Sequence, residues 1–418
     1  MIKSRPILAW AFYDWANSAF AVVVLAGFYP LFFRDYWAAG EPSRQITFWL
    51  GLANSIASLL IVLLAPTLGA IADQGSLKKR LLVISSLSGI GMTAALFWIA
   101  QGQWGYAIAL FILANVGWMG ANVFYDSLLI DVAEAKDYDR VSALGYGLGY
   151  LGGGLLFALC VAMTLKPAWF FLQSAQQAVS LSFLLVALWW LAFSLPLWLL
   201  VREQRRHEPK PFLAAAREGF RQLAATFHHI RQLRGVLTFL LAYWLYIDGV
   251  DTVIRMAVDF GKARGIGTGS LITALLMTQF IGFPSAIAFG WLGEKIGARR
   301  GILIAIGVYI GITLWAANLH TASAFYVLAG IVGLVQGGLQ SLSRSLYASL
   351  IPSDKAAEFF GFYNMLGKAA AIIGPLLVGG VGLATGSESW GLLSLLILFI
   401  SGGLLLLIAP ARKNRDPK

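Results

Sequence analysis

The sequence predicts an all-α membrane protein with twelve transmembrane helices in two pseudo-symmetric six-helix halves. Of its 418 residues, 59% are hydrophobic and only 12% are charged, whereas a soluble domain carries about 25% charged residues. Apolar runs of about 20 residues, the length that crosses a bilayer as a helix, recur along the chain. These runs lack the two-residue alternation of a membrane β-barrel. The composition therefore excludes a soluble enzyme, a disulfide-built secreted domain and a disordered chain.

The apolar runs form two groups of six. The first group lies at 8–33, 46–72, 81–100, 104–129, 141–165 and 178–201, and the second at 236–258, 269–293, 301–319, 324–350, 359–384 and 389–409. We expect an N-terminal half at 1–201, a cytoplasmic linker at 202–235 and a C-terminal half at 236–418. The first run is far longer than the apolar core of a secretion signal, about 7–15 residues, which indicates a retained helix.

The linker contains one segment, 212–223, in which apolar residues at helical spacing alternate with bases. This pattern is typical of an amphipathic helix that lies along a membrane surface. The adjacent His228 and His229 do not have metal-ligand spacing on a helix. The single cysteine, Cys160, cannot form an internal disulfide. We therefore expect no metal site and no cofactor.

Membrane topology explains the excess of basic residues. The formal net charge is +11. If both termini are cytoplasmic, 23 of the 31 Lys and Arg residues fall in inner loops and tails, and five fall in outer loops. Inner loops of membrane proteins carry such an excess. The sequence therefore predicts a multi-pass protein of the bacterial inner membrane with both termini cytoplasmic, and no nucleic-acid partner.

Two short inner loops repeat one pattern 221 residues apart. In 69–80, Asp73 stands four residues after a glycine and is followed by a glycine and a basic cluster, and Glu294 has the same surroundings in 290–300. The glycine allows helices to approach, the acid can cap a neighbouring helix N-terminus, and the bases hold the loop inside. A second pair of segments, 10–17 and 244–251, also aligns. The two halves are therefore parallel repeats.

Two six-helix repeats with this loop in both halves resemble the major facilitator superfamily of secondary transporters. The blocks 10–20, 140–154, 336–346 and 358–368 resemble its unknown major facilitator branch, which is related to the vacuolar autophagy-related amino-acid effluxers. The resemblance implies the major facilitator fold, with spans one, four, seven and ten around a central cavity. It also implies transport of small solutes, of which amino acids are the best-known cargo.

Seven charged residues lie inside the predicted spans, where a charge costs about 2.5–3.5 kcal/mol at the bilayer centre. They are Asp14, Asp126, Asp248, Asp251, Arg255, Arg344 and Lys368. Six of the seven lie on the spans that line the cavity in the superfamily. Such residues usually face a cavity and mark a functional site.

Two groups of candidate site residues follow from this pattern. The predicted substrate- or proton-binding residues are Asp14, Asn17, Asn122, Asp248, Asp251, Arg255, Gln340 and Lys368. The predicted gate residues, near the cytoplasmic ends of the spans, are Asp73, Asp126, Arg140, Glu294 and Arg344. Acids would bind a proton or a substrate ammonium, because a buried carboxylate holds a proton more readily, and bases would bind a carboxylate.

Structural alternatives stand beside these roles. Asp251 and Arg255, at i and i+4, form either part of the binding site or a structural ion pair. Lys368 either binds an anionic group or pairs with an acid. Asp14 and Asp248 lack an obvious partner on their own helices, so we expect them to be the coupling or substrate residues.

The predicted function is secondary active transport by alternating access, coupled to protons, with a small zwitterion such as an amino acid or small peptide as substrate. The alternatives are a flippase or exporter of an amphipathic lipid or drug, and a membrane receptor that transports nothing. An intramembrane enzyme is not expected, because the spans lack a His or Ser/Lys constellation. The expected partners are the small-molecule substrate, protons and the lipid bilayer, and the expected oligomeric state is a monomer.

Overall fold

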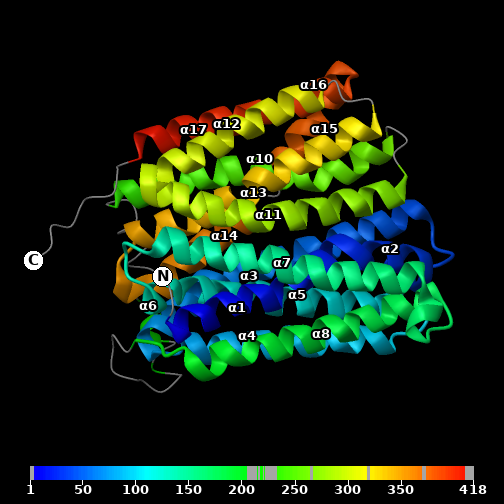
Figure 1. Ribbon diagram of the computed structural model, residues 1–418, viewed down its shortest axis with the longest axis horizontal. Coiled ribbons are helices and arrows are strands. Elements are labelled where there is room, and N and C mark those ends of the chain that lie inside the picture. Colours follow the sequence, from blue (N-terminus) through cyan, green and yellow to red (C-terminus); the bar gives the residue numbers. More distant parts are fainter. Residues whose placement is uncertain are drawn as a thin grey trace, which may run out of the picture.

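The computed structural model describes residues 4–204, 214, 217–219, 221, 233–263, 267–317, 321–369 and 373–409. These residues contain helices and no strand, and twelve helical spans are long and apolar enough to cross a membrane. Figure 1 shows the spans side by side in one bundle, with most of the first half of the chain below the second half. The predicted fold class and the twelve spans are confirmed.

The N-terminal half contains the first six spans. Its elements are α1 (Arg5–Ala19), the π-helical η1 (Phe20–Phe28), α2 (Tyr29–Phe32), the π-helical η2 (Phe33–Trp37), α3 (Ser43–Gly75), α4 (Lys78–Ala95), η3 (Leu96–Trp98), α5 (Trp104–Ser127), α6 (Leu129–Val132), α7 (Tyr138–Leu165), η4 (Pro167–Phe170) and α8 (Ala175–Leu200). The elements from α1 to η2 form one span. We call the end of the bundle where α1 begins the Arg5 end, and the opposite end the Trp37 end.

The C-terminal half contains the other six spans. Its elements are α10 (Arg234–Ala263), α11 (Thr268–Ile296), α12 (Ala298–Ala316), α13 (Ala322–Leu350), η5 (Ser353–Lys355), α14 (Ala356–Ala369), α15 (Ile373–Thr385), α16 (Glu388–Leu393) and α17 (Leu395–Ile408). The eleventh span consists of two helices, α14 and α15. The amphipathic helix predicted at 212–223 lies largely outside the described residues.

The two repeated loops both contain a residue with a positive φ directly after the helix. Ser76 follows α3 with a φ of 50°, and Gly297 follows α11 with a φ of 88°. These positions are 221 residues apart, like the loops themselves. A positive φ turns the chain sharply after a helix and favours glycine. The repeat detected in the sequence therefore extends to the turn that reverses the chain, although only one half uses glycine at this position.

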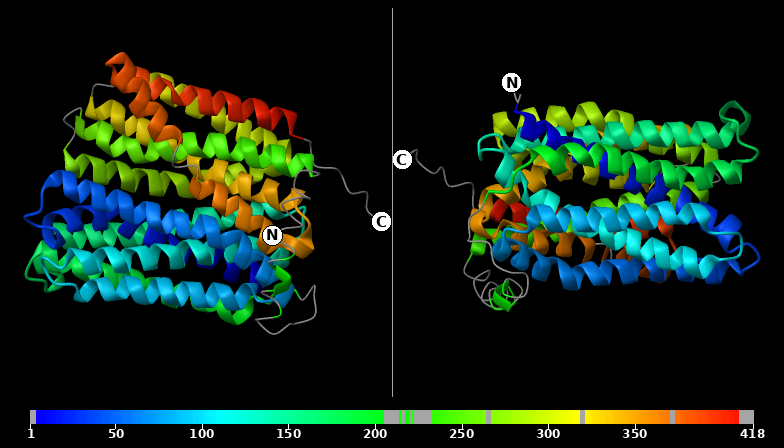
Figure 2. Two further views of the ribbon diagram at one scale, coloured as in Figure 1. Left: turned by 180° about the vertical axis from the view of Figure 1, so that it is seen from behind. Right: turned by 90° about the horizontal axis from the view of Figure 1, so that it is seen from below.

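Two helix pairs carry most of the contact between the halves: α7 with α11, and α3 with α14. The left view of Figure 2 shows this arrangement of the two halves from behind. At Gly361 of α14, a Cβ atom would lie 2.6 Å from the carbonyl oxygen of Ala65 on α3. Only a glycine allows this approach, as is common where membrane helices pack closely. The contact between α3 and α14 lies toward the Arg5 end, because α14 is only the first part of the eleventh span and ends at Ala369.

Candidate functional site

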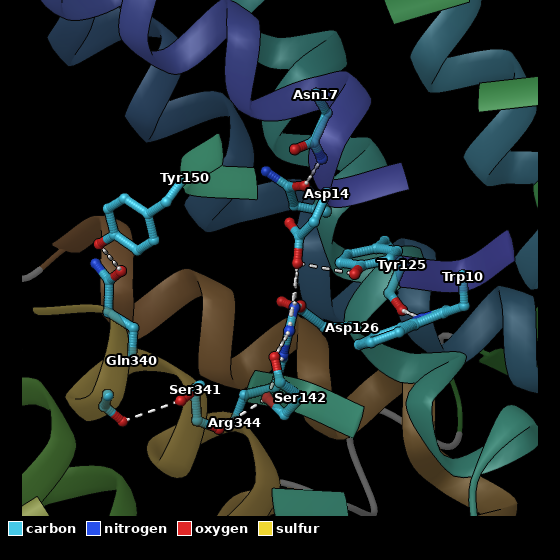
Figure 3. Close-up of polar contacts among 12 residues, drawn as sticks. Trp10, Asp14, Asn17, Tyr125, Asp126, Ser142, Tyr150, Gln340, Ser341 and Arg344 are labelled. Carbon is cyan, nitrogen blue, oxygen red and sulfur yellow. Dashed lines mark hydrogen bonds and ion pairs between the residues drawn. The ribbon is translucent and has the colours of Figure 1, made fainter. Parts of the chain in front are cut away.

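A buried arginine joins the two halves. Arg344 of α13 is 1% exposed, and it donates hydrogen bonds to Asp14 of α1 at 3.3 Å and to Asp126 of α5 at 3.1 Å. It also donates to the hydroxyl and to the carbonyl oxygen of Ser142 on α7, both at 2.9 Å. Figure 3 shows these acceptors gathered around the guanidinium. We call Asp14, Asp126, Ser142 and Arg344 the inter-half network.

Aromatic rings and one glycine surround the guanidinium. Its central carbon lies 4.3 Å from the ring centre of Tyr146, 4.8 Å from that of Trp10 and 5.3 Å from that of Tyr125. Aromatic faces attract a cation. A Cβ at Gly145 would lie 2.8 Å from an oxygen of Asp14, so a larger residue at this position of α7 would displace the carboxylate. The network therefore depends on tight packing of α1, α5 and α7 within the N-terminal half.

A polar cavity of about 280 Å³ lies beside the inter-half network. The predicted site residues in its lining are Asp14, Asn17, Asn122, Asp126, Asp251, Gln340, Arg344 and Lys368. Asn17 donates to the side-chain oxygen of Asn122 at 2.6 Å, and Tyr150 donates to that of Gln340, in the other half, at 3.4 Å. The structure therefore brings these predicted residues together from five spans of both halves.

Two further charged groups line the polar cavity. The ammonium of Lys368 on α14 lies 4.8 Å from the ring centre of Trp118 on α5, so this base also contacts the opposite half. Asp251 of α10 lines the polar cavity and a neighbouring apolar cavity. The side chain of its predicted partner, Arg255, lies outside the described residues, and that pair stays a prediction.

The apolar cavity has a volume of about 320 Å³ and continues from the polar one. Gln336 and Gln340 line both. Beyond them, aliphatic side chains such as Leu271, Ile312 and Leu328 form most of its wall. A solute in the polar cavity therefore has an adjoining apolar space on the side of the C-terminal half.

Asp248 does not line either cavity. It is fully buried, and its carboxylate accepts two hydrogen bonds from the backbone N–H of Gly374, at 3.0 and 3.1 Å. The hydroxyl of Thr252 donates to it at 3.4 Å. Because Gly374 is the second residue of α15, Asp248 caps this helix. The structure thus gives it a partner that helical spacing did not predict, and its role in coupling stays a prediction.

At the Arg5 end, Asp73 connects the halves through backbone groups. This residue accepts hydrogen bonds from the N–H groups of Ala357 at 3.2 Å and Glu358 at 2.8 Å, in the first turn of α14. The ammonium of Lys78 lies 3.3 Å from Asp73 and 3.6 Å from Asp131. The acid of the first repeated loop therefore caps a helix of the other half, and a buried lysine holds it in place.

The acid of the second loop makes a different contact. Glu294 lies 3.7 Å from Arg140 of α7, and both side chains are partly exposed. Nearby, Ser345 of α13 donates to Asp139 at 2.5 Å. At the Arg5 end, α7 therefore contacts α11 and α13 through side chains. In contrast, α3 contacts α14 through the backbone N–H groups of a helix terminus.

Several residues of the site were not predicted. Ser142 has no distinguishing pattern in the sequence. Lys78 lies in a basic cluster that topology alone explains, although it is only 3% exposed. Tyr125 donates to Asp14 at 2.8 Å. Its position directly before Asp126 in span four was the one signal in the sequence that could have identified it.

Comparison with known proteins agrees with this architecture. The family model described as vacuole effluxer Atg22 like matches residues 43–136 and 130–417. An uncharacterized MFS-type transporter of Bacillus subtilis, YxiO, is 37% identical over 98% of this chain and 95% of its own length. Autophagy-related protein 22 of Coccidioides immitis is 24% identical over 100% of this chain and 88% of its own length. The crystal structure of the human organic anion transporter MFSD10 superposes with a TM-score of 0.75 at 15% identity, covering 97% of this chain and 100% of that one.

Proposed function

The chain belongs to the Atg22-like family of major facilitator transporters, and we propose that its substrate is a small zwitterion, an amino acid or a short peptide. It is a multi-pass membrane protein and a secondary transporter, not an enzyme. The observation that carries the proposal is the polar cavity, which combines acids and bases from both halves in about 280 Å³. A zwitterion offers an ammonium to the acids and a carboxylate to the bases, so both charges would be neutralised inside the membrane.

Lys368 is our proposed contact for the substrate carboxylate, and Asp251 for the ammonium. Lys368 extends across the cavity to Trp118, so an anion bound between the halves would reach it. A hydrogen bond to a charged group contributes about 1.5–3 kcal/mol. Replacing Lys368 with Gln should therefore weaken binding about tenfold or more.

A thermal-shift screen of amino acids, dipeptides and lysolipids on purified protein tests this proposal. The K368Q variant should lose the shift given by zwitterions. The matched control is K355Q, which removes the same charge near the start of α14, outside both cavities. Stabilisation only by ligands without a carboxylate would contradict the proposal.

We propose protons as the coupling ion and Asp14 as their site. Asp14 and Asp126 share one cation, Arg344. A proton on Asp14 would remove one of the two charges that hold the guanidinium, so proton uptake would favour separation of the halves at the Arg5 end. In this proposal that end is cytoplasmic, the membrane is the bacterial inner membrane, and a monomer works by alternating access.

Transport in proteoliposomes with and without a pH gradient tests the coupling. We expect D14N to lose the stimulation by the gradient but to retain exchange of substrate. Asp248→Asn, which changes a carboxylate outside both cavities, should keep the stimulation. If the wild-type protein ignores the gradient, proton coupling is wrong, and specific binding without any flux would favour a receptor.

The apolar cavity favours a second candidate function, export of an amphipathic lipid or drug. Its volume of about 320 Å³ exceeds that of the polar cavity, so it could hold a sizeable apolar group. Ala329→Phe would fill this space, since Ala329 lines only the apolar cavity. Loss of lysolipid binding in that variant, with no response to zwitterions in the wild type, would favour the second candidate.

A further inference from the structure

A basic crevice opens at the Arg5 end of the N-terminal half, between the start of α4 and the end of α8. Its volume is about 770 Å³, and the bases in its lining are Lys79, Arg80 and Arg202. It lies apart from both central cavities and includes none of the residues assigned to transport above. The site therefore needs an explanation of its own.

The acid in the crevice is already engaged. Glu203 accepts hydrogen bonds from the backbone N–H groups of Lys78 and Lys79, both at 3.2 Å, and so caps α4. The ammonium of Lys79 donates to the carbonyl oxygen of Val201 at 2.8 Å. Arg202 lies near enough to Lys79 for the two positive charges to repel each other. With Arg80 and Arg202 exposed at its rim, the crevice attracts an anion from outside.

Apolar side chains continue from the crevice toward the Trp37 end. On α4, Ile84 is 56% exposed and lies one helical turn, about 6 Å, beyond Arg80. On the neighbouring α8, Leu199 is 75% exposed and Leu200 is 48% exposed. In a membrane protein, such aliphatic side chains face acyl chains. The guanidinium groups at the helix ends match the charged headgroup of a phospholipid. The aliphatic side chains that follow toward the Trp37 end match its acyl chains.

We propose that this crevice binds the phosphate of an anionic phospholipid, with Arg80 and Arg202 contacting the headgroup and the exposed side chains of α4 and α8 contacting the acyl chains. Arginine suits this role because its planar guanidinium binds phosphate oxygens in pairs. Basic pockets between transmembrane helices bind anionic headgroups in this way.

The bound lipid acts on the contact between the halves through short links. Glu203 holds the start of α4, whose first residue, Lys78, pairs with Asp73. Asp73 in turn caps α14 of the other half. A headgroup that steadies Arg80 and Arg202 therefore steadies the first turn of α4 and, with it, the contact between α3 and α14. Anionic lipid should thus stabilise the form in which the Arg5 end is closed.

Thermal unfolding in mixed micelles tests the proposal, with dioleoyl phosphatidylglycerol titrated against phosphatidylcholine. Each base near an anionic surface contributes about fivefold in affinity. The R80Q/R202Q variant should therefore need about thirtyfold more phosphatidylglycerol for half of the wild-type stabilisation. Its unfolding temperature in phosphatidylcholine should match that of the wild type, which shows that the fold is intact.

The matched control is R299Q/R300Q, which removes two charges from the equivalent loop of the C-terminal half and should respond like the wild type. An equal loss of response in both double variants would show that net charge alone matters and would overturn the site. Stabilisation of the wild type by phosphatidylglycerol but not by inorganic phosphate or glycerol 3-phosphate supports a lipid. An equal effect of the soluble phosphates would keep the phosphate site but overturn its assignment to a lipid.

Discussion

Replacing Arg344 with Gln should open the Arg5 end of the protein. The guanidinium is buried and is shared by Asp14, Asp126 and Ser142. Without it, two buried carboxylates would lose their cation as long as the halves remain closed. Breaking a buried ion pair by removing one partner costs about 3–5 kcal/mol. When the halves separate, water reaches both carboxylates and the cost disappears.

The cost therefore falls on the closed form alone. Taking about 3 kcal/mol, the ratio of closed to open molecules decreases about 150-fold, since 1.4 kcal/mol corresponds to a factor of ten. A protein that is closed in a ratio of about 99:1 would then have closed and open forms in a ratio of about 2:3.

Distances between spin labels report this ratio directly. Labels at Arg5→Cys and Arg300→Cys, exposed positions on different halves at the Arg5 end, should show a longer distance when Arg344 is replaced. The single native cysteine, Cys160, is first changed to Ala. Arg234→Gln, which removes an exposed charge, should leave the distances unchanged.

Neutralising the two acids supplies the decisive comparison. The triple variant R344Q/D14N/D126N has no unpaired buried charge, so its distribution should return toward the closed form. An unchanged distance distribution in R344Q would refute the reasoning, and so would a triple variant as open as R344Q itself.

Three other outcomes follow from the capping residues. Asp73→Ala should reduce the free energy of unfolding by about 2 kcal/mol, because two buried N–H groups at the start of α14 lose their acceptor while Lys78 keeps Asp131. Glu294→Ala should change it by less than about 1 kcal/mol; thermal unfolding compares the two variants, and equal losses would contradict the distinction. Asp248→Ala should reduce the free energy of unfolding by about 1–2 kcal/mol, because α15 loses its cap, and should leave substrate affinity within about threefold. A large loss of affinity would support the binding role predicted for Asp248 from the sequence. Burial raises the pKa of Glu203 above its ordinary value of 4.5, so the stability that it contributes is greatest below pH 4.5 and decreases as the pH rises through the raised pKa. E203Q should remove that dependence in unfolding temperatures measured across this range, and an unchanged pH profile would exclude it.

The sequence predicted the twelve spans because lipid imposes a simple rule on them: each must be about 20 apolar residues long. It assigned Asp126 and Arg344 to the same group of gate residues because both charges stand near the cytoplasmic ends of corresponding spans. Asp14 could not be assigned to the same cation. Its partner is 330 residues away, and helical spacing reports only neighbours on one helix.

Asp248 shows a second limit of the sequence. Its partner is a backbone N–H, which is available only because α15 begins at Ile373 within the eleventh span. The pair Gly374 and Pro375 was the available signal, since proline favours the first turn of a helix. A charged residue inside a span therefore indicates a polar partner, but a helix terminus and a substrate satisfy that requirement equally well.

The two contacts at the Arg5 end differ in their sensitivity to ionic strength. Asp73 and Lys78 are buried, where dissolved ions screen charges weakly. Arg140 and Glu294 are partly exposed, and at about 1 M salt the Debye length of about 3 Å is shorter than their separation. Concentrated salt should therefore weaken the side of α7 and α11 while the side of α3 and α14 stays joined. The buried hydrogen bonds of Arg344 still join the halves under these conditions, so ionic strength offers a way to weaken one of the two contacts at the Arg5 end without changing a residue.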